Sequence, residues 1–245
     1  MKLSVVIPAY NEEKRLPPSL EKIYRWVKKH NFSWEIIVVD DGSYDNMLAE
    51  LEKFKKRIKN LKVISYKPNR GKGYAVRKGI LKAQGDIIIL TDADLSTPIE
   101  EAEKLMKKIN NGVDITVGSR LVEGAKVSCS ASWFRNTAAK VFLLGVKILL
   151  LYGPKDTQCG FKAFSKKAAR KIFLEVKSSS ILYDLEIFLL AKRNGFKLVE
   201  VPIVWKHDPD SKLRYNLRKS VAIWLELFQL KILYKIILPV RIITQ

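Results

Sequence analysis

Two carboxylates separated by a single alanine, Asp92 and Asp94, are the residues of this sequence most clearly suited to chemistry. They follow the short apolar run 87–90, which is typical of a strand buried on both faces. Ligands of open α/β sheets bind beyond the carboxyl ends of the strands, where both acids would then lie. Two such acids repel each other unless a cation or a proton lies between them, and Mg²⁺ or Mn²⁺ binds carboxylate and phosphate oxygens. The pair predicts a metal that joins the protein to a nucleoside diphosphate, with a solvated turn and helix cap as the alternative.

Two other apolar runs end in polar residues in the same manner. Residues 3–9 lead into Tyr10 and Glu12, and residues 35–39 lead to Asp41. Strand and helix patterns alternate about every 25 to 30 residues along this part of the chain. This alternation predicts an α/β fold with a mostly parallel, open sheet flanked by helices, in which the acid-bearing strand ends point the same way.

The remaining elements follow from the same patterns. Further strands are expected at 61–66, 114–118 and 198–205, and helices at 16–29, 98–110, 182–194 and 217–238. Neither a dinucleotide-binding glycine motif nor a Walker lysine motif occurs, so a nucleotide would be held by acids, a metal and scattered bases. One such base is Lys72 in the glycine-rich turn 69–73, which contacts a phosphate or lies at a solvated helix start.

The charge of the chain limits its partners. Its 245 residues carry a formal net charge of +20, which favours nucleic acid, an acidic membrane surface or phosphorylated small molecules. Buried strands that end in carboxylates oppose a polyanion, so no nucleic-acid partner is expected. The two cysteines form no pattern typical of a disulfide framework or a metal site. Met1 leads at once into a strand, so we expect no secretory signal.

The C-terminal helix has an amphipathic pattern. Its most polar stripe consists of Arg218, Ala222, Glu226 and Gln229. The rest of the helix is apolar and aromatic, and we expect Trp224, Leu225, Phe228, Leu230 and Ile232 to enter a membrane interface, with Lys231 and Lys235 at lipid phosphates. No stretch has eighteen uncharged apolar residues, so no spanning helix is expected. A helix packed on the sheet or in a dimer is the alternative.

These motifs together resemble a known family. Segments 5–12, 38–43, 69–73, 92–94 and 118–120 resemble the family 2 glycosyltransferases with the GT-A fold. Segments 156–162, 183–186 and 201–205 are similar to the dolichyl-phosphate β-glucosyltransferases, which are sisters of the dolichyl-phosphate mannose synthases. The resemblance implies a nucleotide-sugar donor, a divalent metal and a polyprenyl-phosphate acceptor.

By position, the resemblance also implies roles for single residues. The nucleoside pocket would consist of Pro8, Tyr10, Glu12 and Asp41. Asp92 and Asp94 would hold the metal and the diphosphate, and Arg120 and Arg135 would face phosphates. Ser96 stands where the mannose synthases have a glutamine metal ligand, and Lys212 is our substitute for an arginine that they carry.

The chemistry can also be argued from the residues. A nucleoside diphosphate leaves with growing negative charge, which a metal on the two acids and the arginines would stabilise. The acceptor phosphate is mostly ionised because its second pKa is about 6, so a strong base is less needed. Asp156 is the candidate base or acceptor-orienting group, or else a turn cap, and Gln158 lies in the same insertion. Glu186 would meet a sugar hydroxyl or pair with a lysine.

We therefore expect an inverting transferase that moves glucose from UDP-glucose to dolichyl phosphate. The alternatives are a GDP-mannose donor or a soluble sugar acceptor. The catalytic domain would cover 1–213, with a donor half at 1–120 and an acceptor half at 121–213, and 214–245 would form an interfacial helix. The protein would then sit peripherally on an anionic membrane surface, at the cytoplasmic face. The oligomeric state stays open.

Overall fold

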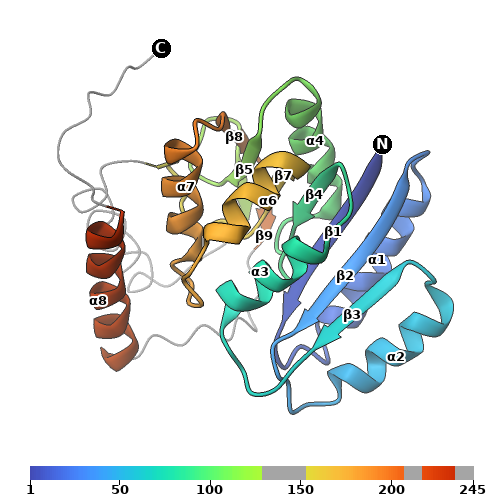
Figure 1. Ribbon diagram of the computed structural model, residues 1–245. Coiled ribbons are helices and arrows are strands. Elements are labelled where there is room, and N and C mark those ends of the chain that lie inside the picture. Colours follow the sequence, from blue (N-terminus) through green and yellow to red (C-terminus); the bar gives the residue numbers. More distant parts are fainter. Residues whose placement is uncertain (129–152, 207–216, 235–245) are drawn as a thin grey trace. The chain divides into compact units, whose positions relative to one another are not determined.

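The computed structural model describes residues 1–128, 153–206 and 217–234. In this part of the chain seven strands form one sheet in the order β3-β2-β1-β4-β7-β5-β8 (Figure 1). The strands are β1 Lys2–Ala9, β2 Ser33–Asp40, β3 Leu61–Ser65, β4 Ile87–Leu90, β5 Ile115–Ser119, β7 Lys162–Ser165 and β8 Leu198–Pro202. All neighbours are parallel except β7, which is antiparallel to both β4 and β5. The prediction of a mostly parallel, open sheet is confirmed.

Helices cover both faces of this sheet (Figure 1). On one face lie α1 Leu16–Lys28, α2 Met47–Arg57, the 3-10 turn η1 Ile99–Glu101 and α4 Ala102–Asn110, which share a core with the inward side chains of β1, β2 and β4. On the other face lie α3 Lys72–Lys82, α6 Lys166–Glu175 and α7 Tyr183–Arg193. Gly79 of α3 is so close to Val6 and Val39 that a Cβ there would collide with both side chains.

The register of the central strands brings their acid-bearing ends to one edge. Ala9 pairs with Asp40, and Val6 pairs with Leu90, in parallel ladders. The four residues of β4 are fully buried, as their unbroken apolar pattern predicts. The segments that follow β1, β2 and β4 therefore meet at the same side of the sheet.

Three features differ from the expected elements, and the first is helix α6, which was not predicted. Strand β7 was not predicted, because Lys-Ala-Phe-Ser carries a lysine and is too short to show a period. The expected strand at 198–205 is interrupted at Ile203: its first part is β8, and its second part, β9 Val204–Lys206, pairs with β6 Lys126–Ser128 in a separate two-stranded sheet.

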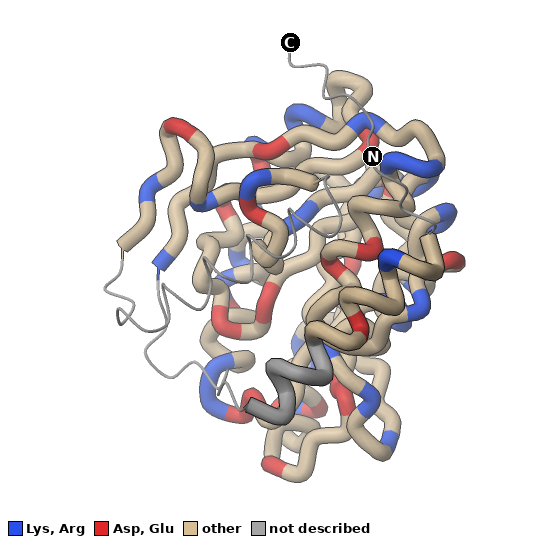
Figure 2. The backbone as a smooth tube through the Cα atoms, turned by 90° about the vertical axis from the view of Figure 1, so that its left-hand side faces the viewer, with Lys and Arg blue, Asp and Glu red and all other residues tan. Residues whose placement is uncertain are grey.

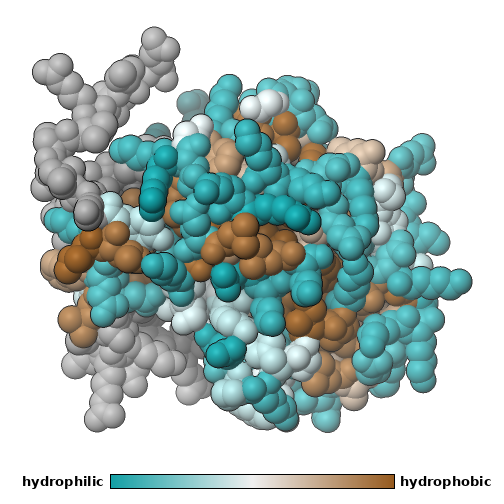
Figure 3. Space-filling view, in the orientation of Figure 1, coloured by the Kyte–Doolittle hydropathy of each residue, from teal (hydrophilic) through white to brown (hydrophobic). Residues whose placement is uncertain are grey.

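The surface carries both signs of charge. Lys, Arg, Asp and Glu are spread along the backbone in Figure 2. Hydrophilic side chains cover most of the face seen in Figure 3, with smaller hydrophobic patches between them. This distribution agrees with a chain that is 29% charged.

Helix α8, Leu217–Leu233, belongs to a second compact unit and is described by itself. Leu225, Phe228, Ile232 and Leu233 are exposed, whereas Leu227 and Leu230 are buried. The expectation that Leu230 enters a membrane is therefore wrong. The side chains of Arg218 and Ala222, and all of Lys235, lie outside the described residues. No described helix combines the length and apolarity that a membrane span requires.

Candidate active site

Asp92 lies just beyond the end of β4, against the first residue of α3. The Lys72 ammonium donates a hydrogen bond of 2.6 Å to Asp92 Oδ1. Burial raises the pKa of Asp92, but the hydrogen bond and charge of Lys72, together with the charges of Lys162 and Arg120, outweigh it, and the net pKa is lowered. The glycine-rich turn thus delivers a cation directly to the first acid of the motif. Lys72 is thus bound to Asp92 rather than left at a solvated helix start, and its contact with a phosphate stays a prediction.

The turn Cys159–Gly160 forms the wall behind Asp92. A Cβ on Gly160 would lie 2.6 Å from Cγ of Asp92 and 2.7 Å from its Oδ1, and closer still to its Oδ2. Only a residue without a side chain allows the backbone to approach this carboxylate so closely. Burial raises the pKa of the Cys159 thiol to about 11, so this cysteine is an uncharged part of the wall.

Asp94 is linked to the end of β1 by an arginine that sequence reasoning missed. The backbone N–H of Ser96 donates to Asp94 Oδ1 at 2.9 Å, and Arg15 Nη1 lies 3.7 Å from Asp94 Oδ2. Arg15 also donates to both carboxylate oxygens of Glu12, through Nε at 2.6 Å and through Nη2. Glu12 therefore belongs to the same charge network as the Asp92–Asp94 motif. The signal that could have revealed Arg15 is its position three residues after Glu12.

The two acids fit a divalent cation. Their donor set is two carboxylates at the exposed end of a strand, which suits a metal that also takes phosphate oxygens. In the described part of the chain no third His, Cys, Asp or Glu completes a metal-binding cluster with them. The backbone of Gly160 packs directly against the Asp92 carboxylate, in space that a Cβ at position 160 would fill. This contact keeps the carboxylate at the end of β4. Asp92 and Asp94 would thus hold the metal together with ligands from the donor.

Asp41 holds the glycine-rich turn that carries Lys72. Its carboxylate accepts from the Asn69 side chain at 2.9 Å and from the backbone N–H groups of Arg70 and Gly71 at 2.8 and 2.9 Å. Gly71 has a φ of +95°, which is a conformation that favours glycine. The Asp41 carboxylate is buried, and its two oxygens accept hydrogen bonds from the glycine-rich turn. A direct contact of Asp41 with a nucleoside stays a prediction.

Glu186 supports the same turn from the other side. This fully buried carboxylate of α7 accepts from the backbone N–H groups of Lys177 and Ser178 at 3.0 and 2.8 Å. It thereby shapes the loop 177–180, whose Ser179 carbonyl accepts from Gly73 N–H at 2.9 Å. A sugar contact of Glu186 stays a prediction, whereas the structure gives it a role in loop geometry.

Arg120 and the buried Asp156 form a two-point ion pair, in which the Arg120 side chain is partly buried. Arg120 Nε and Nη2 donate to the two oxygens of Asp156 at 2.7 and 2.8 Å, and the Arg120 backbone N–H adds a third bond at 3.0 Å. Burial raises the pKa of Asp156, but the arginine outweighs it and lowers the net pKa. The guanidinium also lies over the Trp205 ring, 5.2 Å from its centroid. Asp156 is thus placed to orient Arg120.

A second buried pair, Lys162 and Asp184, was not assigned a role from the sequence. Lys162 is fully buried on β7, and its ammonium donates to Asp184 Oδ1 at 2.6 Å and to the Cys159 carbonyl. Burial raises the pKa of Asp184, and Lys162 only partly opposes this. The pair lies within electrostatic range of Asp92, whose pKa the Lys162 charge also lowers. Charged residues are rarely buried, so no local pattern predicts this pair.

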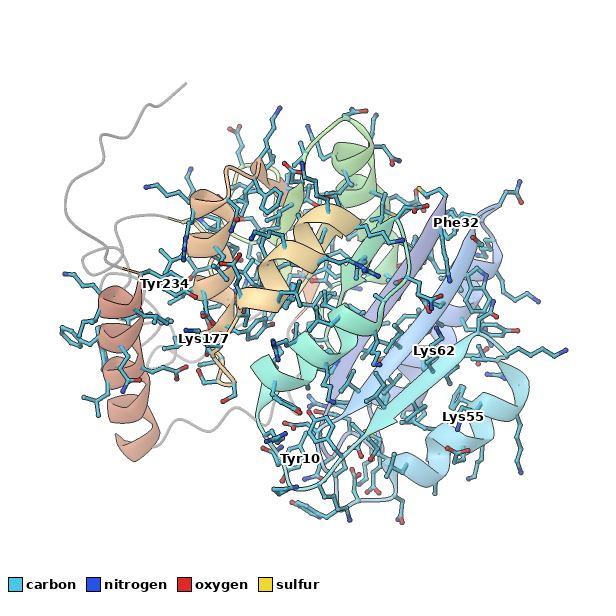
Figure 4. The ribbon with its side chains drawn as sticks, in the orientation of Figure 1. Tyr10, Phe32, Lys55, Lys62, Lys177 and Tyr234 are labelled. Carbon is cyan, nitrogen blue, oxygen red and sulfur yellow. The ribbon has the colours of Figure 1, made fainter. Side chains whose placement is uncertain are left out.

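Some of the remaining predicted site residues lie in the part of the chain that the structure describes, and others lie outside it. Pro8 is buried in β1 opposite Val39. Tyr10 is 40% exposed, and its ring meets Tyr44 edge-on at 6.1 Å; Figure 4 labels it near the rim of the sheet. The Gln158 side-chain nitrogen is buried without a hydrogen-bond partner among the described residues. Arg135 and Lys212 lie outside the described residues.

Known structures share this architecture. Glucosyl-3-phosphoglycerate synthase from Mycobacterium tuberculosis, solved with UDP, superposes with a TM-score of 0.67 over 96% of this chain and 81% of its own, at 17% identity. The same enzyme solved with Mn²⁺, UDP and phosphoglyceric acid gives a TM-score of 0.69 over 97% and 80%, at 16% identity. At these identities the likeness concerns the fold, and it confirms the GT-A-like prediction.

Sequence comparison is more specific. Dolichyl-phosphate beta-glucosyltransferase ALG5D of Trichomonas vaginalis is 34% identical, covering 96% of this chain and 74% of its own. The dolichyl-phosphate beta-glucosyltransferase of Homo sapiens is 35% identical, covering 86% and 69%. Residues 4–173 match Glycosyl transferase family 2. Together with the acids at the strand ends, these matches establish that the chain belongs to glycosyl transferase family 2 and is a nucleotide-sugar glycosyltransferase.

Proposed function

We propose that this chain transfers glucose from UDP-glucose to dolichyl phosphate or a related polyprenyl phosphate. The two relatives reported above are named dolichyl-phosphate beta-glucosyltransferases, and their sequences align with most of this chain. The single observation that carries the proposal is the Asp92–Asp94 motif at the end of β4, with Lys72 at 2.6 Å from Asp92. Two acids and a cation at this edge of the sheet suit a diphosphate and its metal.

The reaction we propose is a direct displacement. An acceptor phosphate oxygen forms the new bond to the anomeric carbon, and the bond from that carbon to the diphosphate breaks on the opposite side. The configuration therefore inverts, from an α-linked donor to a β-linked product. A divalent cation on Asp92 and Asp94 would neutralise the diphosphate as its charge grows.

The residues around the acids supply the remaining charge. Asp156 occupies Nε and Nη2 of Arg120, which leaves Nη1 to donate to a phosphate. Lys72 provides a second cation at the same edge. Because the acceptor phosphate is mostly ionised at neutral pH, its second pKa being about 6, no strong base is needed. We therefore assign Asp156 to the positioning of Arg120 rather than to proton abstraction.

The other site assignments remain part of the proposal. They place Pro8, Tyr10, Glu12 and Asp41 at the nucleoside, Ser96 near the metal, and Gln158, Glu186, Arg135 and Lys212 toward the acceptor. The cation is Mg²⁺ or Mn²⁺, and the choice between them is left to titration.

We also propose that the enzyme works at an anionic membrane surface, on its cytoplasmic face and without spanning it. The support is α8, whose Phe228 is 50% exposed and whose Ile232 is 75% exposed, one turn apart on one side of the helix. We propose that residues 1–213 form the catalytic domain and that residues 214–245 form the segment at the membrane interface. A lipid acceptor requires such proximity, because its phosphate lies at the bilayer surface.

The test is a donor panel with an extraction readout. Labelled UDP-glucose and GDP-mannose are each incubated with polyprenyl phosphate, and the product is measured in the organic phase. We expect label transfer from UDP-glucose and no product from Asp94→Asn. Asp86→Asn is the matched control, since this exposed aspartate lies at the opposite end of β4. Transfer from GDP-mannose alone would refute the donor, and full activity of Asp94→Asn would refute the role of the acids.

A further inference from the structure

Helices α3 and α6 lie side by side on their face of the sheet (Figure 1). Arg77 of α3 donates from Nε to the Phe173 carbonyl at 2.9 Å, and from Nη2 to the Leu174 carbonyl at 3.4 Å. These carbonyls belong to the last turn of α6, where a cation is favourable because of the helix dipole. The outward side chains of the two helices therefore share one surface.

This surface is strongly basic. Helix α3 carries no acid, and α6 carries a single one, Glu175. We define the α3–α6 basic face by six exposed cations: Lys78, Lys82, Lys166, Lys167, Arg170 and Lys171. Among the described residues, Lys171 is the member of this set that forms an ion pair, at 2.9 Å from Glu175. Six like charges held on two adjacent helices repel one another and favour an anionic surface opposite them.

The helices on the other face of the sheet have a different composition, because each of α1, α2 and α4 carries at least one acid among its bases. In α2, Lys53 binds Glu50 at 2.7 Å and Lys55 binds Glu52 at 2.9 Å. In α1, Arg25 binds Glu21 at 2.9 Å. Part of the charge of that face is thus neutralised locally, although Lys22, Lys56, Lys107 and Lys108 form no ion pair among the described residues, whereas Glu175 is the one acid of α3 and α6.

An apolar side chain stands inside the basic face. Leu174 is 65% exposed, and it follows Arg170 and Lys171 by four and three residues, on the same side of α6. A leucine surrounded by lysine and arginine suits a surface that is anionic outside and apolar beneath, as a lipid bilayer is. A nucleic-acid backbone offers the anions without the apolar layer.

One end of the basic face lies toward the active site, whereas Lys82, Lys166 and Lys167 lie at the opposite end of the sheet, where Lys166 contacts Gln84 and Asp86. Helix α3 begins at Lys72, which binds Asp92, and the loop after α6 accepts a hydrogen bond from Gly73 at Ser179. A bilayer against this face would therefore reach the active-site rim at the start of α3 and the end of α6.

We propose that the α3–α6 basic face docks on an anionic lipid bilayer. The inference rests on the proposed function, since a lipid-linked acceptor is what makes a bilayer the relevant surface. Each basic residue near an anionic membrane contributes about 1 kcal/mol, so four of them change the partition coefficient by on the order of 1,000-fold at low salt.

The test compares two variants of equal net charge by vesicle flotation of the full chain. The face variant combines Lys78→Gln, Lys82→Gln, Lys167→Gln and Arg170→Gln. The control variant combines Lys22→Gln, Lys56→Gln, Lys107→Gln and Lys108→Gln, four exposed lysines of α1, α2 and α4. With vesicles that contain phosphatidylserine, we expect the face variant to lose about 1,000-fold in partition at low salt and the control to lose less than about tenfold. With phosphatidylcholine alone, the three proteins should behave alike.

Three outcomes would overturn the inference: an equal loss in both variants, no loss in either, or wild-type retention of duplex RNA or DNA in a gel shift that the face variant alone loses. Activity with UDP-glucose and a detergent-solubilised polyprenyl phosphate separates this inference from the proposed function. We expect the face variant to keep that activity, because none of its four residues contacts the site. Absence of activity in the wild type would instead refute the proposed function, whatever the vesicles show.

Discussion

Gly160→Ala should reduce catalysis through a displacement of Asp92. Gly160 has no positive φ, so an alanine meets no backbone strain at this position. Its Cβ would instead lie 2.6 Å from Cγ of Asp92, whereas ordinary contacts begin at 3.4 Å. The carboxylate must therefore shift by about 1 Å, and a shift of that size in a reacting geometry can cost about 100-fold in rate.

The assay is kcat/KM for glucose transfer from labelled UDP-glucose to polyprenyl phosphate, measured across a Mn²⁺ titration. We expect kcat/KM to fall by about 100-fold, with a higher Mn²⁺ concentration needed for half-maximal rate. Gly195→Ala is the matched control. Its φ of +68° strains an alanine, but nothing lies within 4 Å of the added Cβ. This control should lose about 1 kcal/mol of stability and keep its activity.

The reasoning would be refuted by a Gly160→Ala protein that melts like the wild type and keeps kcat/KM within about twofold. That result would mean that the carboxylate of Asp92 has room to move without consequence. A loss of activity that appears only together with unfolding would equally remove the argument for a local effect on Asp92.

Two further predictions concern stability and membrane binding. Asp156→Asn should cost about 3 kcal/mol near neutral pH, because it leaves the partly buried Arg120 guanidinium without a carboxylate partner. The folded-state pKa of Asp156 is lowered, so its stabilisation is present above the unfolded pKa of about 3.9 and is lost as the pH falls through the folded pKa. Denaturant titrations of wild type and variant should therefore converge below about pH 4, and a constant gap would contradict the assignment. Phe228→Asn with Ile232→Asn should leave the melting temperature nearly unchanged and weaken binding to phosphatidylcholine vesicles by at least about tenfold, since both side chains are exposed. Gln229→Asn on the same helix should bind like the wild type, and equal binding by all three proteins would exclude α8 from the membrane.

Local patterns in the chain determined the central sheet. The apolar runs before Tyr10, Asp41 and Asp92 are unbroken because parallel central strands are buried on both faces. Burial on both faces constrains the composition of each strand by itself. Such a strand can therefore be recognised in the sequence without knowing which strands pair with it. The acids at the ends of these runs stand out for the same reason, and they led to the site and the family.

Only the tertiary structure decided which partners surround those acids. Arg15 meets Asp94, Arg120 meets Asp156, and Lys162 meets Asp184, at separations of tens of residues along the chain. No spacing rule links such residues, because their proximity depends on how separate elements pack.

The tertiary structure also decided strand β7. Its four residues have too little periodicity to predict a strand, and the antiparallel pairing with β4 and β5 supplies the hydrogen bonds that make it one. Lys162 within it is a charged residue that becomes buried only because Asp184 and the Cys159 carbonyl meet its ammonium. Burial of that charge is a property of the folded environment, which composition and local pattern do not contain.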